Sequence, residues 1–196
     1  MGRYPSGQRE QTVNLPVIAF VGSNPSRPTI SHWQSEKAAK VQCVQMLITT
    51  DQLPQYGQQL AMVDGSFDPI HDGHIGYFKA ASELGVPLLC NVAPDSWTVT
   101  KHPVFLEQEQ RGIVLDAIRY VSFVHLSNIA TVEVLRMLQP KFYIKGNDWI
   151  ARGGVPEVEA AVCMEFGIEV VYLPTVTNSS SKILNEWTAK SEKNAQ

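Results

Sequence analysis

Residues 65–74 read Gly-Ser-Phe-Asp-Pro-Ile-His-Asp-Gly-His, and the expected fold follows from this stretch and its flanks. The apolar run Leu60–Val63 comes directly before it, and apolar residues at helical spacing, starting with Ile75 and Phe78, come directly after it. The pattern predicts a strand, a turn through Asp-Pro and a helix that begins at Gly73. Backbone N–H groups at the start of such a helix have no partner within the helix, and they attract phosphate.

Two histidines, His71 and His74, lie at this turn. Their ring N–H groups can donate hydrogen bonds to phosphoryl oxygens on which charge develops. A zinc half-site and a pair of surface histidines are the alternatives. Zinc needs further ligands, and the three cysteines of the chain form no Cys-x-x-Cys pattern. The stretch therefore favours a nucleotide phosphate site over a metal site.

Composition excludes several classes of protein. The chain has 196 residues and a formal net charge of −3, so it lacks the basic surplus that is typical of nucleic-acid binding. Three cysteines at irregular spacing indicate free thiols in a reducing compartment. The apolar runs, such as 17–21, are too short to span a bilayer. We therefore expect a cytoplasmic protein that binds neither nucleic acid nor membrane.

Short apolar runs alternate with helical periodicity from about residue 60 onward. Strands are expected at Leu60–Val63, Leu88–Val92, Val121–Leu126, Phe142–Ile144 and Ile168–Leu173. Helices are expected at Gly73–Leu84, Glu107–Ile118, Ala130–Leu138, Pro156–Phe166 and Ser180–Trp187. This alternation predicts an α/β, Rossmann-like fold with a doubly wound, parallel five-stranded sheet. Such sheets bind ligands beyond the carboxyl ends of their strands, where residues 65–74 then lie.

The domain organisation is expected to have three parts. Residues 1–46 form an N-terminal extension, partly flexible, with a possible strand at 17–21 and a capping box at 31–34. The stretch 41–49 fits a helix or a strand equally well. Residues 47–190 form the α/β domain, and 191–196 form a short tail.

Two basic residues follow the second expected strand. Lys101 lies in the polar segment Thr98–Pro103, from which its ammonium group can reach a phosphate. Arg111 lies early in the helix that starts near Glu107, and its planar guanidinium suits two-point contact with phosphate. The alternatives are an ordinary surface lysine, and an Arg111–Glu107 pair on a solvated helix face.

Two later segments also fit a nucleotide. After the fourth expected strand, Gly146 allows close approach of the backbone, Lys145 can face a phosphate, and Asp148 can accept hydrogen bonds from a base or ribose. A plain turn with solvated charges is the alternative there. Before the last helix, Ser179, Ser180 and Ser181 can either cap the helix or cradle the β- and γ-phosphates of a nucleotide.

Together these motifs resemble the cytidylyltransferase-like nucleotidyltransferase family, whose hallmark is Gly-x-Phe-Asp-x-x-His-x-Gly-His. The chain fills every hallmark position, with Gly65, Phe67, Asp68, His71, Gly73 and His74. The resemblance runs from about residue 48 to 187. Residues 109–111, 144–148 and 179–183 are most similar to the branch that contains the heptose-1-phosphate adenylyltransferase domain and glycerol-3-phosphate cytidylyltransferase. Asp64 stands where that branch usually has Asn, and Pro69 and residues 93–95 also depart from it.

The resemblance implies transfer of a nucleoside monophosphate from ATP or CTP to a sugar phosphate or polyol phosphate, with release of pyrophosphate. It assigns His71, His74, Lys101 and Arg111 to catalysis. It assigns nucleotide binding to Gly65, Ser66, Phe67, Asp68, Gly73, Lys145, Gly146, Asp148, Ser179, Ser180 and Ser181. It also implies Mg²⁺ bound to the triphosphate rather than to a protein metal site, and a possible homodimer.

Two other functions remain as alternatives. A nucleotide sensor without catalysis would keep the fold, although the four expected catalytic residues argue against it. Class I aminoacyl-tRNA synthetases share a similar histidine motif, but this chain is short and not basic enough to bind tRNA. The choice between ATP and CTP and the identity of the acceptor stay open.

Overall fold

The computed structural model describes residues 47–174 and 179–194. These residues lie within one compact unit. The expectations for residues 1–46, including the strand at 17–21 and the capping box at 31–34, lie outside the described residues. The one part of 41–49 that is described forms an isolated bridge from Leu47 to Val124 and then leads into a helix.

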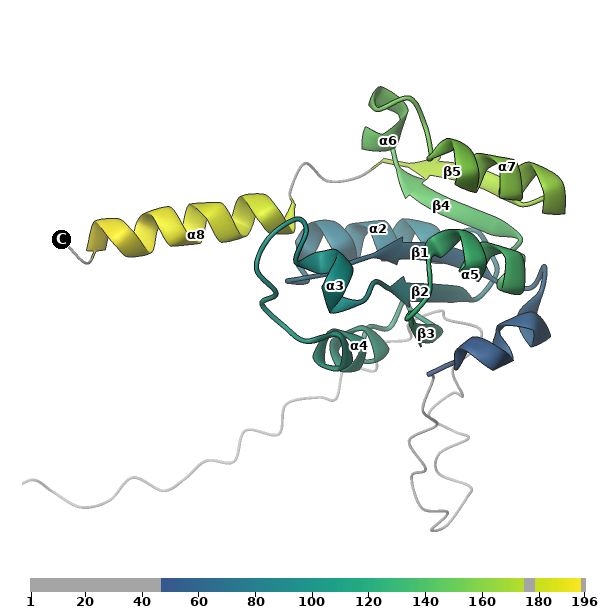
Figure 1. Ribbon diagram of the computed structural model, residues 1–196, viewed down its shortest axis with the longest axis horizontal. Helices are drawn as coiled ribbons and strands as arrows, with labels where there is room; N and C mark the ends of the chain where they lie inside the picture. Colours follow the sequence, from purple (N-terminus) through teal and green to yellow (C-terminus); the bar gives the residue numbers. More distant parts are fainter. Residues whose placement is uncertain (1–46, 175–178, 195–196) are drawn as a thin grey trace, which may run out of the picture. The chain divides into compact units, whose positions relative to one another are not determined.

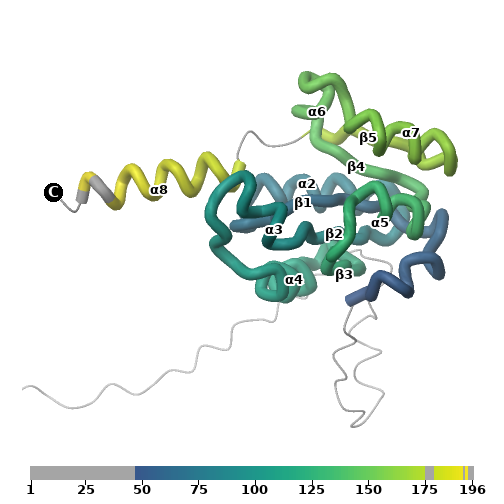
Figure 2. Tube along the Cα trace, viewed as in Figure 1, coloured from purple at the N-terminus to yellow at the C-terminus, as the bar shows by residue number. Residues whose placement is uncertain are grey.

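Five parallel strands form one sheet in the order β3-β2-β1-β4-β5 (Figure 1). Their bounds are β1 Ala61–Gly65, β2 Leu88–Val92, β3 Phe123–Leu126, β4 Phe142–Gly146 and β5 Glu169–Leu173. Each strand overlaps a range expected from the sequence. The chain builds outward from β1 to β3 and then returns to place β4 on the other side of β1, so β1 and β4 are neighbours that lie far apart in the sequence (Figure 2). The doubly wound, Rossmann-like fold is confirmed.

The five expected helices are present as α2 Asp72–Ser82, α4 Gln108–Asp116, α5 Thr131–Leu138, α7 Glu157–Phe166 and α8 Ser180–Asn194. Helix α8 continues beyond the expected end at Trp187. Three short helices in the described residues were not expected: η1 Thr50–Tyr56, α3 Asp95–Thr98 and α6 Asp148–Ala151. Helices α3 and α6 span four residues each, which is too short for a helical period to stand out in a sequence.

Apolar side chains fill both faces of the sheet. On one face α2 and α4 pack Phe78 and Leu115 against the strands. On the other face η1, α5 and α7 contribute Leu53, Leu135 and Val162 (Figure 1). Burial from both sides explains why β2 is apolar or buried along its whole length.

This topology sets the place of the functional site. Strand order reverses between β1 and β4, and ligands of open α/β sheets bind at such a reversal, beyond the carboxyl ends of the strands. The turn that follows β1 contains residues 65–74, and the turn that follows β4 contains residues 146–148.

Candidate active site

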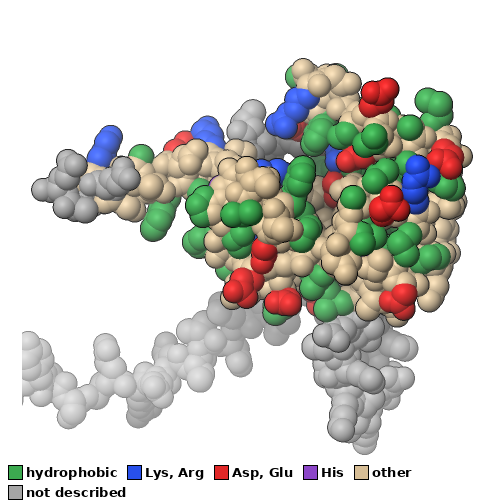
Figure 3. Space-filling view, viewed as in Figure 1, with side chains coloured by type: hydrophobic (Ala, Val, Ile, Leu, Met, Phe, Trp, Pro, Cys, Tyr) green, Lys and Arg blue, Asp and Glu red, His purple; other side chains and the backbone are tan. Residues whose placement is uncertain are grey.

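A pocket of about 850 Å³ lies beyond the carboxyl ends of β1 and β4. In the space-filling view, basic side chains lie around a hollow between α6 and the start of α8 (Figure 3). The structure brings most of the expected site residues to this pocket, namely Gly65, Ser66, Phe67, His71, Gly73, His74, Lys101, Lys145, Gly146, Asp148, Ser179, Ser180 and Ser181. Asp68 and Arg111 do not line it.

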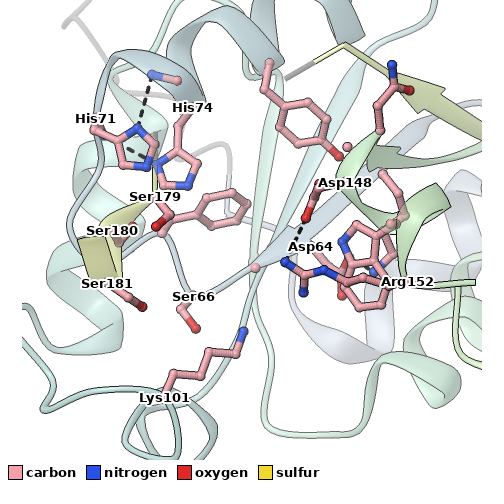
Figure 4. Close-up of a pocket in the computed structure, with 18 of the residues that line it drawn as sticks. Asp64, Ser66, His71, His74, Lys101, Asp148, Arg152, Ser179, Ser180 and Ser181 are labelled. Carbon is pink, nitrogen blue, oxygen red and sulfur yellow. Dashed lines mark hydrogen bonds and ion pairs between the residues drawn. The ribbon is translucent and has the colours of Figure 1, made fainter. Parts of the chain in front are cut away.

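The two histidines are held by the start of α2. His71 is the residue that caps this helix, and its Nδ1 accepts a hydrogen bond from the backbone N–H of Gly73 at 3.1 Å. The backbone N–H of His71 in turn donates to Nδ1 of His74 at 3.4 Å. The rings stack with their centroids 3.9 Å apart (Figure 4). Because both Nδ1 atoms accept, each neutral ring carries its proton on Nε2.

The environment keeps both imidazoles neutral. Burial lowers the pKa of His71. Burial, together with the neighbouring His71, lowers the pKa of His74 to about 3. Nε2 of His71 is buried without a hydrogen-bond partner in the part of the chain that the structure describes, and so is Oγ of Ser66. A buried polar atom without a partner is costly, so these two atoms at the pocket wall are suited to a polar ligand.

Close packing shapes the loop that precedes α2. Phe67 adopts the left-handed backbone conformation, with a φ of 53°. Its ring covers Gly65 so closely that a Cβ atom there would lie 3.2 Å from the ring. The same ring meets His74 edge-on, with centroids 5.3 Å apart. Gly65 and Phe67 thus act on the site by fixing the path of the backbone and the position of His74.

Arg111 and Asp68 form a buried clamp instead of contacting the pocket. Asp68 is fully buried, and its carboxylate accepts the backbone N–H groups of Phe105 and Leu106, each at 2.8 Å. The fully buried guanidinium of Arg111 donates to the carbonyl groups of Ser66 and Leu106. The clamp ties the segment that carries Lys101 to the turn that carries the histidines.

Arg111 is therefore buried between loops, whereas the sequence predicted that its guanidinium contacts a phosphate. The alternative of a pair with Glu107 on a solvated helix face is wrong, because the guanidinium is buried and pairs with Asp95 of α3. A buried guanidinium is tolerated only when its donors are satisfied, and here two carbonyl groups and one carboxylate satisfy them. The structure gives Arg111 a role in positioning the loops, and its contact with phosphate stays a prediction.

Lys101 lines the pocket without a carboxylate partner. Among the side chains that the structure describes, no carboxylate forms an ion pair with its ammonium group, which lies 5.5 Å from the centre of the Trp97 ring. Burial lowers the pKa of Lys101. An anionic ligand would therefore supply the missing counter-charge.

Lys145 also lines the pocket, but carboxylates already hold it. Its Nζ atom lies 2.7 Å from Oδ1 of Asp64 and 3.6 Å from Oε2 of Glu159. The rings of Tyr143 and Trp149 each lie 4.6 Å from this ammonium group. The fold brings these two carboxylates to Lys145 from β1 and α7, and the sequence does not show them. The contact of Lys145 with a phosphate stays a prediction.

The three serines combine the two roles that the sequence left open. Oγ of Ser179 accepts the backbone N–H of Lys182 at 3.3 Å, which is a helix-capping contact. The hydroxyl of Ser180 donates to the carbonyl of Pro69 at 2.9 Å, so the start of α8 is bound to the turn before α2. All three serines also line the pocket (Figure 4).

The pocket is also lined by residues to which the sequence assigned no role, namely Asp64, Tyr77, His102, Asn147, Trp149 and Arg152. Tyr77 donates to the carbonyl of Ile144 at 2.7 Å, which joins α2 to β4. Arg152 lies 3.0 Å from Asp148 and 5.4 Å from the centre of the Trp149 ring. The spacing of Asp148 and Arg152, four residues apart, is the signal that would have indicated this pair on a short helix.

Within the described ranges, no group of three or more His, Cys, Asp or Glu side chains is arranged to hold a metal ion. Among the helices of those same ranges, none has the length and apolar character needed to cross a membrane.

Comparison with known proteins gives related sequences and a related fold. The sequence profile of the family described as Cytidylyltransferase-like matches residues 62–185. The bifunctional protein HldE of Trichlorobacter lovleyi is 28% identical over 142 residues, which cover 67% of this chain and 28% of that protein. The HldE of Gluconobacter oxydans is 30% identical over 131 residues, which cover 65% of this chain and 27% of that protein. This chain thus spans less than a third of the length of these relatives.

A solved structure shares the fold. The crystal structure of the lipopolysaccharide core biosynthesis protein from Thermoplasma volcanium aligns with a TM-score of 0.51 and 20% sequence identity. The alignment covers 61% of this chain and 99% of that chain. At this level of identity the likeness concerns the fold alone.

Proposed function

Because the chain belongs to the cytidylyltransferase-like family, we propose that it transfers a nucleoside monophosphate from ATP or CTP to a phosphorylated small molecule and releases pyrophosphate. The family expected from residues 65–74 is confirmed by the profile match over more than half of the chain. The observation that carries the proposal is the pair of neutral histidines. Among the described residues, Nε2 of His71 is buried without a hydrogen-bond partner, and His71 lines the same pocket as Lys101 and the serines at the start of α8.

The proposed reaction is a direct displacement at phosphorus. A phosphate oxygen of the acceptor attacks the α-phosphorus of the triphosphate, the new P–O bond forms, and the bond to the leaving pyrophosphate breaks. The acceptor phosphate is already ionised, so no general base is needed. Catalysis then depends on position and on stabilisation of charge. The Nε2–H groups of His71 and His74 donate to the phosphoryl oxygens as their charge increases.

The two sides of the pocket suit different parts of the substrates. The serines and the start of α8 suit the β- and γ-phosphates, and Lys101 supplies positive charge to a phosphate. Asp148 and Trp149, on the β4 side, suit the ribose and base. The substrate is taken as the magnesium complex of the triphosphate. The pocket carboxylates Asp64 and Asp148 already pair with basic side chains, which fits an ion held mainly by phosphate and water.

The acceptor follows from the resemblance alone. The motifs at 109–111, 144–148 and 179–183 are similar to enzymes that act on a sugar phosphate or a polyol phosphate, so we propose that class of acceptor. The cytoplasmic location and the homodimer expected from the sequence stay predictions.

A substrate panel tests the proposal. Each of the four nucleoside triphosphates is combined with several sugar phosphates and polyol phosphates in the presence of Mg²⁺, and pyrophosphate release is measured. One combination is expected to release pyrophosphate in proportion to the acceptor consumed. Tight nucleotide binding without pyrophosphate release from any combination would favour a nucleotide sensor instead.

A further inference from the structure

Tyr143 lies between two carboxyl groups at the β4 side of the pocket. Its hydroxyl oxygen is 2.8 Å from Oε2 of Glu159 and 3.1 Å from Oδ1 of Asp64. A phenol has one proton, so Tyr143 can donate a full-strength hydrogen bond to only one of these oxygens, and sharing the proton between both would weaken each contact. If both carboxyl groups were ionised, the other short contact would place two oxygen lone pairs against each other in a buried site. That contact is a hydrogen bond only when a carboxyl group itself carries a proton.

Counting protons identifies the carboxyl group that carries it. Asp64 also accepts from Nζ of Lys145 at 2.7 Å and from the hydroxyl of Thr131 at 3.2 Å, and both contacts suit an ionised carboxylate. Glu159 lies farther from the ammonium group, at 3.6 Å. The proton therefore belongs on Glu159, which donates to the oxygen of Tyr143 while Tyr143 donates to Asp64.

The charges that face Glu159 agree with this count. Asp64 of β1, Lys145 and Tyr143 of β4 and Cys163 of its own helix are the titratable groups around it. Burial is the main cause that raises the pKa of Glu159, and Asp64 adds to the rise, whereas Lys145 and the hydrogen bond with Tyr143 act in the opposite direction; the net shift is upward. Burial also raises the pKa of Tyr143, so the phenol keeps its own proton.

When Glu159 is protonated, the positive charge of Lys145 is balanced by one carboxylate, that of Asp64. The four groups then have no net charge, in contrast to Lys101, which forms no ion pair within the described ranges. Lys145 has three N–H donors, and Asp64 takes one of them. Because Lys145 lines the pocket, a remaining N–H is available to a ligand there. Without surplus positive charge, that position suits an uncharged acceptor better than a phosphate.

We propose that Asp64 and Glu159 share one extra proton across Tyr143. By balancing the charge of Lys145, Asp64 makes this lysine a hydrogen-bond donor to an uncharged oxygen or nitrogen of the nucleoside. Phosphate is thereby confined to the part of the pocket that Lys101 lines. This inference rests on the proposed nucleotidyl transfer. It makes Asp64 a residue that determines which end of the substrate enters each side of the pocket.

The extra proton is tested first, on the wild-type protein. At pH 7 the infrared spectrum should contain the band of a protonated carboxylic acid, and Glu159→Gln should lack it. The amide of Gln still donates to Tyr143, so this variant should fold as the wild type does. A wild-type spectrum without the band, or a band that persists in Glu159→Gln, would overturn the shared proton.

The confinement of phosphate to the Lys101 side, called sorting below, is tested by calorimetry. The affinities for inorganic pyrophosphate and for an unphosphorylated nucleoside are measured separately. Asp64→Asn combined with Glu159→Gln leaves Lys145 without a carboxylate. We expect this double variant to bind pyrophosphate about tenfold more tightly than the wild type, the effect of one unmatched charge in a partly buried site. Adding Lys145→Met should return the affinity to the wild-type value and weaken nucleoside binding. An unchanged pyrophosphate affinity in the double variant would overturn the sorting role.

A matched control and a separate readout complete the test. Thr131→Val removes a hydrogen bond to Asp64 without changing charge, so its pyrophosphate affinity should stay within about twofold of the wild type. Both binding measurements proceed without turnover. A protein that sorts phosphate in this way but releases no pyrophosphate from the substrate panel would therefore refute the proposed reaction and not this inference.

Discussion

Lys101 and Lys145 reach the same pocket from different segments of the chain, and their surroundings differ. Lys101 lies on the segment between α3 and α4 with an aromatic ring beside it and no carboxylate partner in the described parts of the chain. Lys145 lies on β4 against Asp64 and Glu159. A lysine without a counter-charge attracts an anion, whereas a neutralised lysine serves as a hydrogen-bond donor and stabilises the fold. The difference shows that the type of residue at a pocket wall does not by itself assign a phosphate contact.

The largest effect is expected from replacing Lys145, the lysine whose charge a carboxylate balances. Lys145→Met leaves Asp64 as a buried charge without its partner, so the free energy of unfolding should fall by about 3 kcal/mol. Lys101→Met should change it by less than about 1 kcal/mol, because no ion pair is lost. Urea titration of the two variants measures the contrast. Equal losses of stability would contradict the distinction between the two lysines.

The next effect concerns the histidines. His74→Ala should lower turnover by about 10²–10³-fold with the fold preserved, because a donor to the transition state is lost. Steady-state pyrophosphate release measures it, and circular dichroism checks the fold. Ile75→Ala, a change at a partly exposed neighbour on the same helix, serves as the control. Unaltered turnover in His74→Ala would remove the histidines from the mechanism.

A smaller effect is expected from Lys101 on substrate affinity. Lys101→Met should raise the KM for the triphosphate or the acceptor about tenfold, the cost of one phosphate contact, with a weaker effect on kcat. The KM for each substrate, measured separately, shows which phosphate the lysine serves. A KM that is unchanged for both substrates would make Lys101 an ordinary surface residue.

The smallest effect is a dependence on pH. Burial raises the pKa of Glu159 above its ordinary value of 4.5. The folded protein therefore binds this proton more tightly than the unfolded chain does. The resulting stabilisation is complete below pH 4.5 and is lost as the pH rises through the raised value. In thermal unfolding, the wild type should have a higher Tm than Glu159→Gln at low pH, and this difference in Tm should shrink as the pH rises. A difference that grows with pH would contradict the protonated Glu159.

Local patterns in the sequence were sufficient for the fold and for most of the residues that line the pocket. Strands β1 to β5 are short apolar runs between helical periods, and the turn from Gly65 to His74 contains its own hydrogen bonds. These features depend on neighbours in the chain, so the sequence shows them directly.

The rest of the site depends on contacts between distant residues. The guanidinium of Arg111 is buried because α3 brings Asp95 to it and the turn after β1 brings the carbonyl of Ser66. The charge of Lys145 is balanced because β1 brings Asp64 to it, and α7 brings Glu159 to the same group of side chains. Neither partnership has a fixed spacing in the sequence, so neither could be predicted from it.

Pyrophosphate release tests nucleotidyl transfer most directly. Wild-type protein, His74→Ala and Ile75→Ala are each incubated with the triphosphate and acceptor that the substrate panel selects. We expect the wild type and Ile75→Ala to release pyrophosphate at similar rates and His74→Ala to be about 10²–10³-fold slower. Equal rates for all three proteins, or no release by the wild type with any pair of substrates, would contradict nucleotidyl transfer at this pocket.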